Sequence, residues 1–287
     1  MAVDVGRTGI WSSSRAWPAD AGAAADAAAE LDELGYQALW LGAAPPTLEL
    51  PEALLAATSR IAVATGIVSV WAAPAATVAA SFHRISAAYP GRFLLGLGAS
   101  HAPIVNRGGQ QYRRPYRKLV EYLDGLDAAA APVPPEDRAL AALGPRVLTL
   151  AAERTAGAHP YLVTPEYTHQ ARQILGERPL LAPEQKVILE ADPARAREIA
   201  REFLHMYLQL PNYTANLIRL GFTDEDITGP TDRLVDALVA WGDDEAIAAR
   251  VTAHHDAGAN HVCVQVLTGD PAVLPRAQWR RLAAILG

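Results

Sequence analysis

Ser100 and His101 are residue types that could do chemistry, and they follow directly on an apolar run that ends in two glycines. The stretch 91–101 reads GRFLLGLGASH. An imidazole titrates near neutral pH, so His101 could give up or accept a proton during a reaction. Glycines at a strand end indicate either a sharp turn or bulge, or a backbone that a flat ligand can approach closely. The residues alone leave both interpretations open, with His101 as the candidate catalytic residue.

The glycine spacing does not complete a dinucleotide-binding fingerprint. That motif requires a third glycine at position 101, a helix opening there and an acidic residue about 20 positions later. Position 101 is histidine, and residues 102–115 (APIVNRGGQQYRRP) are typical of a loop. We therefore do not expect a classical Rossmann site.

The other histidines and the single cysteine do not form a metal-ligand pattern. His254 and His255 are adjacent within a helical run, so their side chains diverge. His83, His205 and His261 have no partner at ligand spacing, and one cysteine, Cys263, excludes a thiolate cluster and an intrachain disulfide. We expect no metal site.

The elements that must position these residues alternate between helix and strand. A helical pattern, a glycine and an apolar strand recur along the chain, which predicts repeated βαβ units with a parallel sheet. We expect strands at 3–11, 37–42, 61–70, 93–98, 138–143, 160–164, 185–189 and 261–267, with a last helix at about 275–286. Eight such units in one domain spanning residues 1–287 favour a (β/α)₈ TIM barrel over a doubly wound open sheet. Residues 208–222 look like a helical insertion before the last strand.

Composition places limits on the partners. The 287 residues are 51% hydrophobic and 20% charged with a net charge of −6, which gives no chain-wide attraction for nucleic acid or an anionic membrane. The N-terminal residues lack a basic region followed by an apolar stretch, and no run of about 18 apolar residues occurs. We expect a cytoplasmic protein with a small-molecule substrate.

Residues 64–103 (ATGIVSVWAAPAATVAASFHRISAAYPGRFLLGLGASHAP) resemble the luciferase-like monooxygenase superfamily. The likeness continues through 138–168, 180–200, 211–222 and 234–251, so it covers nearly the whole chain. The chain is most similar to the branch that depends on the deazaflavin coenzyme F420. This resemblance implies the same (β/α)₈ fold and a cofactor that carries out hydride transfer itself.

The resemblance also implies particular cofactor contacts. A non-prolyl cis peptide in the third strand would back the ring, at Ser69–Val70 or, one residue earlier, at Val68–Ser69. The segment beside the ring matches Gly98, Ala99 and Ser100, with His101 as the proton donor or acceptor. The phosphate-binding turn matches the start of a helix, where free N–H groups attract an anion; its residues are Thr164, Pro165, Tyr167 and Thr168.

Three features shape the functional alternatives. A basic cluster, 107–118, is either a rim for the acidic coenzyme or ordinary solvated surface; it contains Arg107, Arg113, Arg114, Arg117 and Lys118. The second strand ends in Gly42 and Ala43, where some relatives carry an ionisable residue. The pocket is then apolar, with Trp40, Trp71, Tyr112 and Tyr213 as aromatic candidates that core packing explains equally well.

The leading interpretation is an F420-dependent oxidoreductase acting on a hydrophobic organic substrate. The alternatives are an FMN-dependent monooxygenase and a non-catalytic paralogue that binds flavin or deazaflavin. Members of the superfamily are often dimers, so a homodimer is possible.

Overall fold

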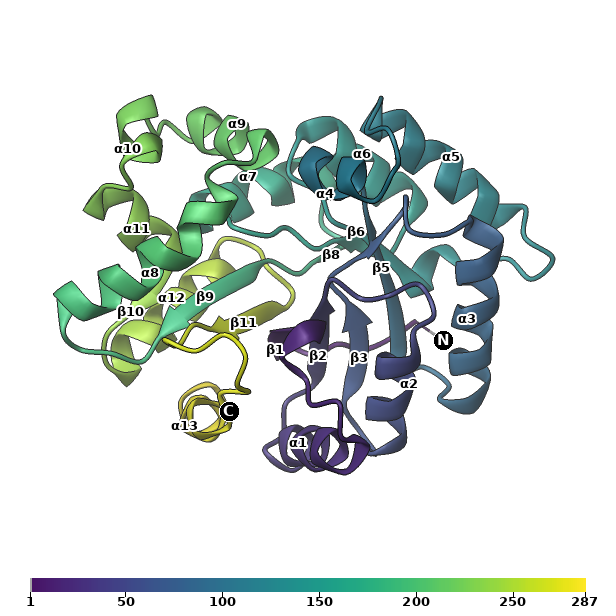
Figure 1. The fold of residues 1–287 in the computed structure, drawn as a ribbon, viewed down its shortest axis with the longest axis horizontal. Helices are drawn as coiled ribbons and strands as arrows, with labels where there is room; N and C mark the ends of the chain where they lie inside the picture. The colour runs from purple at the N-terminus through teal and green to yellow at the C-terminus, as the bar shows by residue number, and fades with distance from the viewer. Residues whose placement is uncertain (1) are drawn as a thin grey trace.

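A computed structural model describes residues 2–287 as parallel strands that alternate with helices (Figure 1). The strands are β1 (Thr8–Ser13), β2 (Ala38–Gly42), β3 (Ala62–Thr65), β4 (Val68–Ser69), β5 (Phe93–Gly98), β6 (Arg138–Leu140), β7 (Gly157–Ala158), β8 (Leu180–Leu181), β9 (Glu184–Ile188), β10 (Val239–Trp241) and β11 (Val262–Val266). The helices are α1 (Ala21–Glu33), α2 (Glu49–Ala56), α3 (Ala75–Ala88), α4 (Ala102–Arg107), α5 (Pro115–Asp127), α6 (Pro145–Arg154), α7 (Pro165–Leu175), α8 (Pro193–Tyr207), α9 (Pro211–Arg219), α10 (Asp224–Thr228), α11 (Asp232–Leu238), α12 (Asp244–Asp256) and α13 (Arg276–Leu286).

The sheet closes into a barrel through the segment that contains β8 and β9. β8 pairs with β7 on one edge, and β9 pairs with β11, which in turn pairs with β1. Only residues 182 and 183 separate β8 from β9, so the two ends of the strand path join. Hydrogen bonds from Ala182 N to Ala158 O and from Glu184 N to Pro160 O continue this edge. The (β/α)₈ fold class is thereby confirmed.

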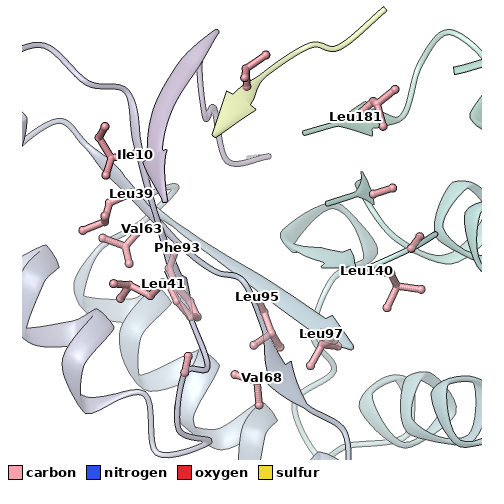
Figure 2. Packing of buried hydrophobic residues seen from close by; sticks show 14 of the residues in the cluster. Ile10, Leu39, Leu41, Val63, Val68, Phe93, Leu95, Leu97, Leu140 and Leu181 are labelled. Carbon is pink, nitrogen blue, oxygen red and sulfur yellow. The ribbon is translucent and has the colours of Figure 1, made fainter. Parts of the chain in front are cut away.

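Alternating side chains build two separate cores. Ile10, Leu39, Val63 and Phe93 lie in register across four strands and face the helices. Figure 2 shows this outer layer, including Val68, Leu95, Leu97, Leu140 and Leu181. The next position on each strand points inward, where Trp11, Trp40, Ala64 and Leu94 form a row across the barrel interior. Period-two alternation within a parallel sheet buried on both faces explains why the strands are apolar throughout.

The glycines of β5 occupy inward positions and make room for a bulge in the neighbouring strand. A Cβ placed on Gly96 would lie 1.8 Å from the carbonyl oxygen of Thr65, and one on Gly98 would lie 3.0 Å from the Ile67 side chain. The non-prolyl cis bond in the described chain joins Gly66 and Ile67, between β3 and β4. The predicted positions, Ser69–Val70 or Val68–Ser69, were wrong, because these residues run as regular strand beside Gly98.

Other predicted elements also differ from the structure. The apolar run 160–164 is not a strand: β7 comes earlier, Pro160 has no N–H to donate, and Leu162 has a left-handed φ of 59°. Residues expected to form a loop after His101 contain the short helix α4.

The predicted insertion, residues 208–222, lies between β9 and β10. β10 interrupts the long segment that leads to β11, and it pairs with β9 where β7 has ended. Helices α8 to α11 pack on one another around a third apolar cluster that includes Leu204, Leu217 and Leu234. They lie together beside β9 and β10 (Figure 1). The insertion therefore adds a helical wall next to the barrel.

Candidate active site

A cavity of about 1130 Å³ opens at the carboxyl ends of the strands. Its lining comes from residues at or just beyond these strand ends and from the helical insertion; it includes Trp11, Ser12, Ala43, Gly66, Ile67, Ala99, Ser100, His101, Ala141, Leu143, Gly144, His159, Tyr161, Tyr207, Tyr213 and Gln265. This end of a (β/α)₈ barrel is where active sites form.

Part of the predicted ring-binding segment lies at this cavity. Ala99, Ser100 and His101 line it, and Ser100 adopts a left-handed φ of 57°, which is uncommon for a non-glycine residue. Ser69 and Val70 do not line it: Val70 is buried against the barrel wall and donates its N–H to Gly98 O. The close approach to the cavity is made instead by Gly66 and Ile67, while Gly98 lies behind Ile67.

His101 is held by a neighbour from the insertion. Its Nδ1 donates to Oδ1 of Asn212 at 3.0 Å, and its ring lies 5.3 Å from that of Tyr213. Burial lowers the pKa of His101, and the hydrogen bond to Asn212 opposes that shift only in part. The ring is therefore neutral at pH 7 with Nε2 as a hydrogen-bond acceptor.

The predicted phosphate turn lies one layer behind the cavity. Thr164 caps α7 by accepting from Tyr167 N, and Pro165 opens the helix as expected. Thr168 is buried and its hydroxyl is bonded to His254 Nδ1. Tyr167 donates to the carbonyls of Ala142 and Leu143, which line the cavity, so this turn supports the cavity wall.

Within the basic cluster, Arg107 reaches the cavity, and Arg15, which the sequence did not indicate, does so from the segment after β1. Arg117 pairs with Glu121, and Lys118 lies over the Trp71 ring. Most of the cluster is thus surface structure.

Among the aromatic candidates, Tyr112 and Tyr213 line the cavity, but Trp71 and Trp40 do not. Trp40 is fully buried beneath it, stacked on His159 at 4.2 Å and donating to His261.

Trp11 and His159 are cavity residues that the sequence analysis missed. A Cβ placed on Gly42 would lie 2.2 Å from the Trp11 ring, so the indole occupies the space that a side chain at the end of β2 would take. The Nδ1 of His159 donates to Ala182 O at 2.7 Å, and burial lowers the pKa of His159 to about 4. The inward register of Trp11 on β1 was the signal that could have indicated it.

Two charges of opposite sign are buried together in the barrel interior. Lys186 Nζ contacts Glu184 Oε2 at 2.5 Å and lies 3.8 Å from the centre of the Tyr161 ring. The Tyr161 hydroxyl lies 3.1 Å from the Tyr207 hydroxyl and 2.8 Å from the side-chain oxygen of Gln265. Charged residues at alternate positions of a predicted buried strand, EQKVI, were the available signal for this network.

No group of three or more histidine, cysteine, aspartate or glutamate side chains among residues 2–287 is arranged to hold a metal ion. None of the helices in this part of the chain is long and apolar enough to cross a membrane.

Fold and cavity together define a (β/α)₈ protein whose cavity is framed by backbone on one side and by aromatic side chains on another. Residues 4–261 match the family model described as luciferase-like monooxygenase, and the chain belongs to this family. A comparison with curated protein sequences finds no match.

Solved structures share the fold at low sequence identity. An F420-dependent secondary alcohol dehydrogenase with an F420–acetone adduct is 16% identical with a TM-score of 0.71, covering 99% of this chain and 100% of its own. The F420-dependent tetrahydromethanopterin reductase from Methanopyrus kandleri is 14% identical (TM-score 0.68; 98% and 97% covered). The oxygenating constituent of 3,6-diketocamphane monooxygenase from Pseudomonas putida, in complex with FMN, is 14% identical (TM-score 0.69; 98% and 96%).

Proposed function

We propose that the protein is an oxidoreductase that binds coenzyme F420 in this cavity and transfers a hydride between it and a hydrophobic organic substrate. The observation that carries the proposal is the cavity itself. It is large enough for a tricyclic ring and a substrate, and Gly66, Ala99 and Ser100 supply a wall of backbone and small side chains against which a flat ring can lie.

The residues present fit such a coenzyme. Ala99 and Ser100 would contact the ring, and Arg15 and Arg107 would face the phosphate and the acidic tail. When bound, the deazaflavin supplies hydride transfer, which requires no metal and no protein nucleophile. His101 would exchange a proton with the ligand through Nε2, since Asn212 holds its Nδ1.

The substrate side of the cavity is apolar. Ile104, Met206 and Val273 line it and remain more than half exposed, at 52%, 60% and 60%. Large exposed apolar side chains grouped at a cavity mouth are typical of a binding site for a hydrophobic molecule.

An FMN-dependent monooxygenase is the second candidate, because known proteins of the same fold divide between F420 and FMN. Equilibrium titration of the purified protein with F420 and FMN, followed by cofactor fluorescence, separates the candidates. We expect saturable binding of F420 and weaker binding of FMN. Tighter binding of FMN would favour the monooxygenase, and binding of neither would overturn the proposed function.

The basic residues give a second, variant-based prediction. Replacing both Arg15 and Arg107 with alanine should weaken F420 binding about tenfold and leave unchanged the affinity for a deazaflavin fragment without phosphate and tail. Arg113→Ala is the matched control, because this arginine of the same cluster does not line the cavity. Equal losses for coenzyme and fragment would contradict a contact with the phosphate or tail.

A further inference from the structure

Two polar atoms on one wall of the cavity have no hydrogen-bond partner within residues 2–287, namely Gln265 Nε2 and the Tyr213 hydroxyl. Their side chains are mostly buried, since Gln265 is 8% exposed and Tyr213 is 7% exposed. Neither atom is enclosed by protein, so both remain open to the cavity that their residues line. Because buried polar groups are normally paired, two open ones at a cavity indicate that a ligand completes them.

The Gln265 amide is held in one orientation. A carboxamide oxygen only accepts hydrogen bonds, so the 2.8 Å contact between Tyr161 and Gln265 Oε1 uses the hydrogen of the Tyr161 hydroxyl. The Tyr207 hydrogen is then the one that lies in the 3.1 Å contact between the two tyrosine hydroxyls. This chain of hydrogen bonds runs in one direction and leaves the N–H groups of Gln265 as its free end.

The wall offers its donors without a net charge. Behind Tyr161, the ammonium of Lys186 contacts the carboxylate of Glu184 at 2.5 Å, and both side chains are fully buried. Burial raises the pKa of the Tyr213 phenol, so its hydroxyl keeps a hydrogen to donate. A carboxylate or phosphate binds best to an unpaired cation, whereas a carbonyl oxygen needs only N–H and O–H donors. These donors therefore favour a neutral carbonyl group.

Aromatic rings surround the two donors. The centre of the Tyr161 ring lies 5.2 Å from that of Trp11, 5.3 Å from that of Tyr207 and 6.1 Å from that of Tyr213. All four residues line the cavity. Rings at these separations present faces and edges against which another flat ring can pack. The carbonyl group that the donors favour therefore belongs to a planar aromatic molecule.

This wall lies across the barrel from the one proposed to hold the coenzyme ring. β11 carries Gln265 and is separated from β5 by β3, β2 and β1 on one side and by β6, β7 and the β8–β9 edge on the other. Ala99 and Ser100 follow β5 directly. A molecule between the two walls would face the coenzyme ring while its oxygen lies at the donors.

We propose that Gln265 Nε2 and the Tyr213 hydroxyl bind a carbonyl oxygen of a quinone substrate, while Tyr161 fixes the direction of the amide. The inference rests on the proposed function and specifies its substrate class. With reduced coenzyme as the hydride donor, one quinone oxygen gains the hydrogen with its electron pair. The other oxygen, bound at the wall, becomes a phenolate and takes a proton from solvent. The products are a hydroquinone and the oxidised coenzyme, so atoms and electrons balance.

Proton–nitrogen NMR of the Gln265 side-chain amide tests the contact directly. The protein is labelled with ¹⁵N-glutamine and saturated with oxidised F420, so that no hydride is available. The probe is 2,3-dimethyl-1,4-naphthoquinone, and 2,3-dimethylnaphthalene is the same ring system without the oxygens. We expect the Gln265 amide resonances, assigned by their loss in Gln265→Met, to move with the quinone and not with the naphthalene.

Each other outcome of this experiment is decisive. No movement with the quinone, or equal movement with the naphthalene, in protein shown to bind F420 would overturn the inference and leave the proposed function intact. Movement that is complete on adding F420 alone would assign the amide to the coenzyme and also overturn the inference. A response to the quinone in protein that fails to bind F420 would support the carbonyl site and overturn the proposed function.

Variants separate the two donors from the residue that orients one of them. By calorimetry, Gln265→Met and Tyr213→Phe should each weaken quinone binding about tenfold and leave naphthalene binding unchanged, since each removes a donor and keeps the bulk of the side chain. Tyr161→Phe keeps both donors but frees the amide to rotate, so it should weaken quinone binding by a smaller factor.

Tyr122→Phe is the matched control for Tyr213→Phe. The Tyr122 hydroxyl is also without a partner in the described chain, but this residue does not line the cavity. Its loss should leave the affinity for both probes unchanged. Equal losses of quinone and naphthalene binding in Gln265→Met or Tyr213→Phe would contradict the assignment of the two donors.

Discussion

Gly96 shows how one residue determines the shape of the barrel wall near the cavity. Its N–H donates to Thr65 Oγ1, and the Thr65 hydroxyl donates back to Gly96 O, both at 2.8 Å. The backbone of Thr65 lies so close that no side chain fits at position 96. The glycine is thus required for packing, which in turn permits the bulge at Gly66 and Ile67 that faces the cavity.

Gly96→Ala should destabilise the protein by about 3 kcal/mol, because a methyl group 1.8 Å from Thr65 O forces the strands apart. Urea unfolding followed by circular dichroism measures the change. Gly229→Ala is the control, since a Cβ there meets nothing within 4 Å, and its stability should change little. Equal stability of the two variants would contradict the close strand contact.

At the scale of elements, α7 supports the loop between β6 and α6 from behind. Tyr167→Phe removes the hydroxyl that donates to Ala142 O and Leu143 O at 3.0 Å. We expect a loss of about 1 kcal/mol in unfolding free energy and weaker F420 binding, because Leu143 lines the cavity. Tyr122→Phe removes a buried hydroxyl without a partner and should be neutral or stabilising. A neutral Tyr167→Phe would contradict the supporting role.

The element order followed from sequence because helix, glycine and apolar strand recur at barrel spacing. The predicted strand boundaries were wrong where strand pairing, and not the hydrophobicity of the residues, determines where a strand begins and ends. The run at 160–164 is as apolar as a strand, but the left-handed Leu162 ends the ladder, and the edge of β9 is completed by β10 from far along the chain.

The candidate site was predictable where it follows a strand, as at Ala99 to His101. Trp11 and His159 were missed as cavity residues: only the inward register of Trp11 on β1 could have indicated it, and the position of His159 depends on which residues face each other across the barrel. Spacing along one segment carries no information about contacts across the barrel, which is why the sequence left Trp40 equally consistent with pocket and core.

At the scale of the whole molecule, three buried neutral histidines make stability depend on pH. Burial lowers the pKa of His159 and His261 to about 4 and that of His254 to about 3. In His254 and His261, both ring nitrogens are hydrogen-bonded. In a neutral imidazole one of them donates and the other accepts.

The unfolded chain therefore binds more protons than the folded one below the ordinary histidine pKa of 6.5. Stability should be fully present above pH 6.5 and fall as the pH drops toward 4, by about 2 kcal/mol per histidine between pH 7 and pH 5. Urea unfolding at the two pH values measures this fall. His254→Gln should show a smaller fall, and constant or rising stability on acidification would contradict the prediction.

Tyr207, Tyr213 and Met206 line the cavity although they belong to residues 189–238, outside the ring of strands. That segment leaves the barrel where β9 ends and returns at β10, and it also contacts the strand ends, through Asn212 at His101 and Tyr207 at Tyr161. Under the proposed function, the barrel strand ends would hold the coenzyme, and the helices of this segment would determine which organic substrates fit beside it.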